Sequence, residues 1–148
     1  MPLRDVQLVD ASVPETATVA EAAATLFAAS VPALAVLDDG GRVAGIFAEE
    51  DVLKAVFPRY LAEVRHTAFL SDDTPSLDEQ ARSVRDRPVR EFARPVETLR
   101  ADDSQVHAAE RFIHTGQDAL PVVDGESFVG MLSIAALCHA RLERAQER

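Results

Sequence analysis

Cysteine, tryptophan and lysine are nearly absent from this sequence of 148 residues, which contains one cysteine, Cys138, and no tryptophan. A single cysteine cannot form an intrachain disulfide, so we expect a reducing compartment. We expect Cys138 to be a buried or inert thiol rather than a redox sensor. Aromatic residues make up only 5% of the chain. The core must therefore consist mainly of Ala, Val, Leu and Ile.

Long apolar runs are also missing, because no stretch of about 18 apolar residues is present. The beginning of the chain, MPLRDVQLVD, lacks the apolar core of a signal peptide. We therefore expect a cytoplasmic protein without a membrane span. Basic residues are scarce relative to acidic ones, and the net charge is −10. Nucleic acids and anionic membranes bind mainly through Lys and Arg, so the sequence disfavours both as partners.

Catalytic signatures are the last group of missing features. The sequence shows no nucleophile with a base at a recognisable spacing and no paired-carboxylate pattern. It also has no glycine-rich phosphate loop of the Walker or Rossmann kind. We therefore expect that the protein is not an enzyme.

The sequence does contain one phrase twice. ALAVLDDGGRVAGIF begins at Ala33 and ALPVVDGESFVGML begins at Ala119. Each phrase is a short apolar run, a glycine-containing turn and a second apolar run, which is typical of a β-hairpin. The second copy is one residue shorter within its turn, where length changes are best tolerated.

Helices are predicted on both sides of each hairpin. Thr18 begins the first helix, and Glu21 completes a possible capping box. Ser104 begins the corresponding helix of the second half, and Gly116 suits its end. An acidic stretch starts the helix after the first hairpin, Pro58 ends it, and SIAALCHARLERAQER forms the closing helix. The residues expected to face the core are Ala22, Leu26 and Ala29 in the first helix and Ala108, Phe112 and Ile113 in its counterpart.

Each half therefore follows the order strand–helix–strand–strand–helix. A half of about 50 residues cannot bury enough apolar surface alone. We expect an α/β fold in which two repeats pack sheet to sheet about a pseudo-twofold axis. The expected boundaries are 1–58 for the first repeat, 59–87 for a connector with helical segments, and 88–148 for the second repeat and C-terminal helix. Within the connector, LDEQARSVRD is predicted to form a short helix.

These doubled motifs resemble a tandem pair of CBS domains, named after cystathionine β-synthase, over residues 11–57 and about 88–142. The strongest match is SQVHAA, followed by DALPVVD and GMLS. The resemblance implies a regulatory module, often called a Bateman module, whose clefts hold AMP, ADP, ATP or S-adenosylmethionine. It also implies a homodimer that modulates a protein partner of unknown identity. The alternative is a ligand-free interaction module with degenerate nucleotide sites.

The family motif places Ser or Thr after a glycine and an Asp three residues further on. In such a site the Asp accepts the ribose hydroxyls, and the hydroxyl meets a phosphate at the helix start. The first repeat keeps Gly45 and Asp51 but has Ala48 at the hydroxyl position; the second keeps Ser133 but has Ala136 in place of the Asp. The first cleft is therefore favoured for a nucleoside.

Two acidic neighbours, Glu49 and Glu50, favour AMP, adenosine or S-adenosylmethionine over ATP in that cleft. The alternative for Asp51 is a solvent-facing acid of the first helical turn, and the alternative for Ser133 is a helix N-cap. The expected ligand-binding residues are Asp51, Gly45, Ile46, Ser12, Val13 and Ala33 in the first cleft, and Ser133, Thr98, Leu99, Ala119 and Met131 in the second. For the apolar wall residues, plain packing is the default interpretation.

Three weaker patterns remain. His107, Glu110 and His114 share one helix face, but we expect solvated side chains rather than a metal site. His66 is expected to be structural. Five connector arginines could meet a phosphate or an acidic partner, but a surface balanced by Asp78, Glu79, Asp86 and Glu91 is favoured. These arginines are Arg82, Arg85, Arg87, Arg90 and Arg94.

Overall fold

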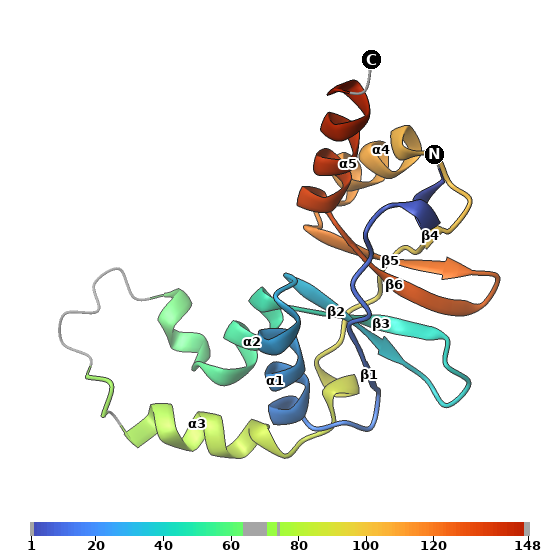
Figure 1. Ribbon diagram of the computed structural model, residues 1–148. Helices are drawn as coiled ribbons and strands as arrows, with labels where there is room; N and C mark the ends of the chain where they lie inside the picture. The colour runs from blue at the N-terminus through green and yellow to red at the C-terminus, as the bar shows by residue number, and fades with distance from the viewer. Residues whose placement is uncertain (1, 64–70, 74, 147–148) are drawn as a thin grey trace.

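Two repeats of the predicted element order are present in the computed structural model, which describes residues 2–63, 71–73 and 75–146 (Figure 1). The first repeat contains β1 (Ser12–Pro14), α1 (Val19–Ala29), β2 (Ala33–Leu37), β3 (Val43–Ala48) and α2 (Glu49–Val56). The second contains β4 (Leu99–Arg100), α4 (Gln105–Thr115), β5 (Ala119–Asp124), β6 (Ser127–Ser133) and α5 (Ile134–Gln146). The strand–helix–strand–strand–helix prediction is confirmed in both halves. His66 lies outside the described residues.

Each repeat forms a three-stranded sheet with the same topology. The orders are β1-β2-β3 and β4-β5-β6; the first pair of each sheet is parallel and the second antiparallel. The two sheets face one another in the middle of the molecule (Figure 1). Ala119 and Met131 of the second sheet belong to the same buried cluster as Val13 and Ile46 of the first. The predicted packing of sheet against sheet is therefore confirmed.

Helix boundaries follow the local signals of the sequence. Thr18 accepts a hydrogen bond from the Glu21 amide at 3.1 Å, and the Glu21 carboxylate accepts one from the Thr18 amide at 3.3 Å. Ser104 caps α4 by accepting from the His107 amide at 3.1 Å, and Gly116 ends α4 with φ 72°. Within the described residues, no helix combines the length and apolar character needed to cross a bilayer.

The structure contradicts the expected burial of Ile113 and excludes burial of Cys138, whose inertness stays a prediction. Ile113 is 79% exposed on α4, because the buried stripe of that helix runs through Ala108 and Phe112, four residues apart. Cys138 is also exposed, because the neighbouring Leu137 is the residue of α5 that enters the core. Each exposed residue directly follows the buried residue of its helix, and successive residues of a helix are about 100° apart around its axis.

The connector contains the predicted short helix as part of α3 (Pro75–Arg85) and two short 3₁₀ segments, η2 (Arg59–Ala62) and η3 (Val89–Glu91). The α3 helix is anchored to α2, because the Gln80 side chain donates to the Ala55 carbonyl at 2.9 Å. Farther along, the hydroxyls of Tyr60 and Ser76 lie 2.8 Å apart. The connector therefore packs on the helical side of the first repeat. The expected boundaries at residues 58 and 88 stay predictions.

Each half is completed by the segment that precedes the other half. Leu3, in the 3₁₀ segment η1 (Leu3–Asp5), is fully buried in the core of the second repeat. Val9 and Met131 exchange backbone hydrogen bonds of 3.0 and 2.7 Å. Conversely, Val89 is fully buried in the core of the first repeat, and its amide donates to the Ala17 carbonyl at 2.7 Å. The two halves are thereby interlocked.

Candidate functional site

The side chain of Asp51 lies at the centre of the candidate site. It occupies the third position of α2 and is only 7% exposed. Its Oδ2 accepts from the Ala48 amide at 2.8 Å, and its Oδ1 accepts from Arg94 Nε at 2.6 Å. Arg94 also donates through Nη2 to Glu50 Oε1 at 3.1 Å. Asp51 is therefore a buried, ion-paired carboxylate and not a solvent-facing helix acid.

The incomplete family motif has a direct structural meaning, since Ser-x-x-Asp is also a capping box. In the first half the Asp51 carboxylate caps the Ala48 amide, but alanine has no oxygen to return a bond. In the second half Ser133 Oγ accepts from the Ala136 amide at 3.0 Å, but Ala136 has no carboxylate. Each repeat retains the opposite half of the box. Ser133 is thus a helix N-cap, which was the alternative to phosphate binding in the sequence analysis.

The backbone of the connector brings Arg94 to Asp51. Arg94 and Ile46 exchange backbone hydrogen bonds of 2.9 and 2.8 Å, so residue 94 is paired to the edge of β3. Gly45 permits this approach, because a Cβ at that position would lie 2.7 Å from the Arg94 carbonyl oxygen. Real Cβ atoms essentially never come that close to another atom. The glycine of the motif therefore has a packing role that requires no ligand.

The second half has the same backbone arrangement without the charges. There Val9 pairs with Met131, and a Cβ on Gly130 would lie 2.8 Å from the Leu8 Cβ. Val9 thus takes the place of Arg94, while Ala136 takes the place of Asp51. Only the first half carries a cation and a carboxylate at this point.

The electrostatics of the pair keep Arg94 charged. The hydrogen bond that Arg94 donates to Asp51 raises the pKa of the guanidinium, burial partly opposes this rise, and the nearby charges of Asp51 and Glu50 add to it. A raised pKa on a cation means that its stabilising contribution is complete below the ordinary value and is lost only above it. That window lies in strongly alkaline solution. The Arg94 guanidinium is therefore charged at every physiological pH.

The predicted cleft walls are mostly core. Five of them share one buried cluster and are at most 6% exposed: Val13, Ala33, Ile46, Ala119 and Met131. Leu99 is buried in the other cluster, Ser12 is half-buried and Thr98 is exposed. The structure therefore brings residues of both predicted clefts together between the sheets, but it does not bring Leu99 and Thr98 into that group. Their contact with a ligand stays a prediction.

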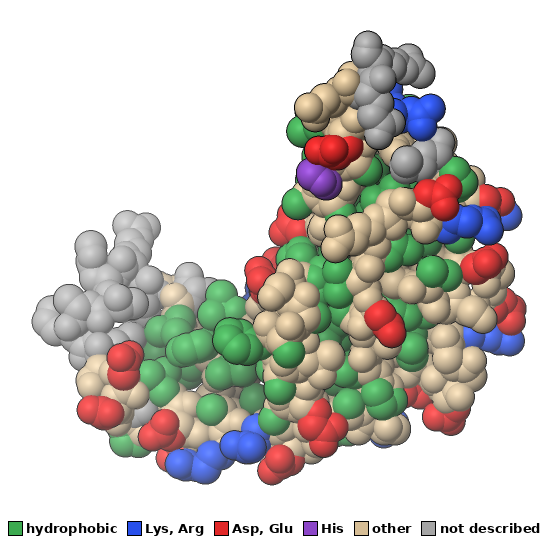
Figure 2. All heavy atoms as spheres, viewed as in Figure 1, with side chains coloured by type: hydrophobic (Ala, Val, Ile, Leu, Met, Phe, Trp, Pro, Cys, Tyr) green, Lys and Arg blue, Asp and Glu red, His purple; other side chains and the backbone are tan. Residues whose placement is uncertain are grey.

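A hollow of about 530 Å³ lies between α1 and the start of α2, where Leu26, Phe27, Glu49 and Val52 help to line it. Two more hollows lie near these elements. A cavity of about 200 Å³ beside Ala136 is lined by Val6 and His139 among others, which is smaller than the roughly 300–1,000 Å³ of ligand pockets. Another hollow, of about 960 Å³, lies against α2; its lining does not include Asp51 and combines apolar residues such as Leu53 and Phe57 with the charged Lys54, Arg59 and Glu63. Figure 2 shows hydrophobic side chains gathered over this part of the first repeat.

The connector arginines separate into two groups. Arg87 pairs with Glu91 at 2.7 Å and Arg85 lies 3.6 Å from Asp86, which is the acid-balanced surface that the sequence favoured. Arg94 departs from that interpretation by reaching the candidate site instead. Sequence reasoning missed this role because the partner Asp51 is 43 residues away. No local pattern in the sequence links Arg94 to Asp51.

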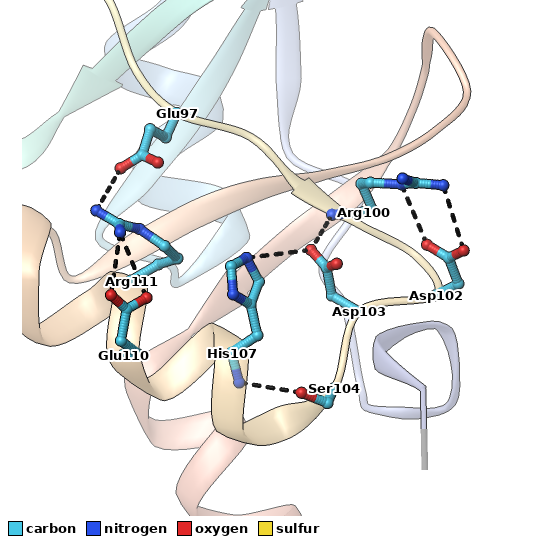
Figure 3. Close-up of polar contacts among 8 residues, drawn as sticks. All are labelled: Glu97, Arg100, Asp102, Asp103, Ser104, His107, Glu110 and Arg111. Carbon is cyan, nitrogen blue, oxygen red and sulfur yellow. Dashed lines mark hydrogen bonds and ion pairs between the residues drawn. The ribbon is translucent and has the colours of Figure 1, made fainter.

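The three helix residues weighed as a metal site do not converge on one point: His107 turns to Asp103, whereas Glu110 and His114 contact one another. His107 Nε2 lies 3.8 Å from Asp103, and Glu110 pairs with Arg111 at 3.1 Å (Figure 3). His114 Nδ1 lies 2.8 Å from the Glu110 carbonyl oxygen. Over the described ranges of the chain, no three His, Cys, Asp or Glu residues are grouped to hold a metal ion.

Comparison with known proteins gives a consistent result. The family model described as "CBS domain" matches residues 3–58 and 89–143. Comparison with curated proteins found no relative of the sequence.

Among similar solved structures is a CBS domain-containing protein of unknown function from Kribbella flavida, with 18% identity, 96% and 99% of the two chains covered, and TM-score 0.76. Another is a Pyrobaculum aerophilum CBS domain protein complexed with AMP, with 24% identity, 99% of both chains covered and TM-score 0.69. A third is CBSX2 in complex with AMP, with 20% identity, 97% and 98% covered, and TM-score 0.70. The fold is therefore that of a CBS pair.

Proposed function

This chain belongs to the CBS domain family, and from that premise we propose that it is a regulatory module that binds an adenosine-containing ligand in its first cleft. Ligand binding would shift the relative position of the two repeats and thereby alter a partner protein. Such a shift requires a ligand that binds one arrangement more tightly than the other. The interlocked repeats offer a mechanical link, because the segment carrying Arg94 leads directly into the second repeat.

The single observation that carries this proposal is the Asp51 carboxylate. It stands at the helix start where the family motif places its ribose-binding Asp, and its position is fixed by the Ala48 amide. A carboxylate can accept both hydroxyls of a ribose. The second half has Ala136 at the corresponding position, so the proposed ligand belongs to the first cleft. Two similar structures, the Pyrobaculum aerophilum protein and CBSX2, were solved with AMP, which supports an adenosine-type ligand.

Among such ligands, we place AMP, adenosine and S-adenosylmethionine ahead of ADP and ATP. Glu49 and Glu50 are exposed beside Asp51 and would repel a polyphosphate. The ligand acts in this proposal as a regulator and not as a reactant.

We also propose that the module works as a homodimer through its helices. Phe27 on α1 and Ile113 on α4 occupy corresponding positions of the two repeats and are 89% and 79% exposed. Leu142 on α5 is 70% exposed, and Phe57 just after α2 corresponds to it. Apolar side chains repeated at matching positions favour a symmetric contact between two copies.

A thermal-shift screen over AMP, adenosine, ADP, ATP, S-adenosylmethionine and NADH tests the ligand proposal. A ligand at 100 times its dissociation constant stabilises the folded state by about 2.7 kcal/mol, which is easily measured. We expect AMP, adenosine or S-adenosylmethionine to raise the midpoint, and ATP to do so less. No shift with any of the six at millimolar concentration would contradict the proposal.

The second candidate is a ligand-free interaction module, and one observation favours it. Both surviving polar groups of the motifs already have internal partners, since Asp51 binds Arg94 and Ser133 caps α5. In that case the exposed apolar residues would bind a partner without any nucleotide. A flat thermal-shift screen combined with a stable dimer would favour this candidate.

A further inference from the structure

We infer that Arg94 is a specificity-determining residue, which makes the first cleft select adenosine ligands that carry an anionic group, such as a nucleoside monophosphate, over neutral nucleosides. This inference rests on the proposed function and deepens it by naming the charge class of the ligand. Its basis is the contact between the Arg94 guanidinium and the carboxylate that a ribose would need.

Arg94 holds the one Asp51 oxygen that is not bonded to the backbone. The Oδ2 atom is taken by the Ala48 amide, which belongs to the fold of α2, and only Oδ1 is bonded to a side chain that can move. With 7% of Asp51 exposed, little of its carboxylate can be reached while Arg94 is in place. A ribose diol therefore competes directly with the guanidinium.

Only the side chain of Arg94 is free to leave. Its backbone is held by two hydrogen bonds to Ile46, and the same segment is anchored five residues earlier by the buried Val89. The guanidinium therefore stays close to the cleft after it leaves Asp51. Its side chain is 35% exposed, so it loses a strong partner without gaining full hydration.

A displaced guanidinium needs a new anion. Glu50 alone provides one contact at 3.1 Å, through Nη2, and leaves Nε without its former acceptor. A phosphate on the ligand offers the planar, two-point recognition that arginine prefers. A neutral nucleoside takes Asp51 and offers the guanidinium no anion in exchange. The ion pair therefore favours anionic ligands.

The second repeat shows that the fold does not require this charge pair. Val9 and Ala136 occupy the corresponding positions there, with the same backbone pairing of Val9 to Met131. Replacing Arg94 by an uncharged residue is therefore compatible with the local backbone. This makes the substitution a clean test.

The test is isothermal titration of AMP and of adenosine into the wild-type chain, Arg94→Met and Arg94→Lys. We expect the wild type to bind AMP at least about tenfold more tightly than adenosine, the range of one charge-assisted contact. Arg94→Lys should keep most of this preference because it keeps the charge. Arg94→Met should lose it, with weaker AMP binding and tighter adenosine binding. Arg94→Gln serves as a second uncharged variant should Arg94→Met unfold.

The possible failures are distinguishable. Binding of both ligands with an AMP-to-adenosine ratio unchanged in the uncharged variants would overturn the inference and leave the proposed function standing. Equal wild-type affinities for AMP and adenosine would overturn it as well. Binding of neither ligand by any of the folded variants would overturn the proposed function, and the inference with it.

Discussion

The Arg94 guanidinium donates to the Asp51 carboxylate at 2.6 Å across 43 residues of sequence. This contact joins the connector to the first turn of α2 and places a fixed positive charge inside the candidate site. Asp51 is the only one of the two repeats' ribose-binding positions that still carries a carboxylate, so in the proposed function the same contact would also limit access to the site.

The strength of this ion pair can be measured with a double-mutant cycle. Asp51 is buried and Arg94 is about one-third exposed, so we expect a coupling energy between the values for surface and buried pairs, about 1–2 kcal/mol. Urea unfolding of wild type, Arg94→Met, Asp51→Asn and the double variant measures this coupling energy. The control is the exposed Arg42–Glu126 pair, which is formed at 2.8 Å and should couple by less than about 0.5 kcal/mol. Equal coupling energies in the two pairs would contradict the claim that the Arg94–Asp51 pair is stronger than a surface ion pair.

Adding an N-cap oxygen to α2 and removing the one on α5 should change stability in opposite directions. Ala48→Ser supplies the missing N-cap oxygen of α2 and should raise the free energy of unfolding by about 0.5–1 kcal/mol. Ser133→Ala removes the existing N-cap of α5 and should lower it by about 1 kcal/mol. Urea denaturation measures both. A loss of stability in Ala48→Ser would show that Ala48, which is 9% exposed, has no room for the hydroxyl.

A methyl group on Gly45 should be far more harmful than one on another glycine of the same hairpin. Gly45→Ala places a Cβ 2.7 Å from the Arg94 carbonyl oxygen, and we expect a loss of about 1–3 kcal/mol. Gly40→Ala is the matched control, because its nearest contact is an ordinary 3.5 Å to Asp38 Oδ1. Thermal unfolding compares the midpoints of the two variants, and we expect the lower midpoint for Gly45→Ala. Similar midpoints would show that residue 94 can move away at little cost.

The exposed apolar residues on the helices should control self-association. We expect sedimentation equilibrium to give a dimer at micromolar concentration, and the double variant Phe27→Glu/Ile113→Glu to shift it to monomer, because it places charges in an apolar contact. Val129→Glu is the control, since Val129 is 40% exposed on a strand rather than on a helix. A wild-type monomer, or a dimer unaffected by the double variant, would rule out this face.

Much of the fold could be predicted because its signals are local. The capping box of Thr18 and Glu21, the stop at Gly116 and the glycine turns of both hairpins each depend on residues a few positions apart. The doubling of the hairpin phrase then supplied the symmetry, since one repeat alone could not bury its sheet. Such features can be predicted from the sequence because they depend on local backbone geometry rather than on distant partners.

The candidate site was less predictable for the opposite reason. Asp51 was found from the motif, but its partner Arg94 depends on the exchange of segments between the repeats, which no local pattern reveals. Similarly, Ile113 was placed in the core because it follows Phe112, and only the packing of α4 shows which of the two is covered. The N-cap role of Ser133 was one of two interpretations of the sequence, and the structure selects it.

The most direct measurement of the central claim is titration of AMP into the wild-type chain, Asp51→Asn and Ser133→Ala. Asparagine keeps an oxygen for the Ala48 amide but removes the charge that would hold a ribose. The account predicts saturable binding by wild type, a loss of about tenfold or more in Asp51→Asn, and little change in Ser133→Ala. Unchanged affinity in Asp51→Asn, or a loss confined to Ser133→Ala, would place the ligand in the other cleft and contradict the account.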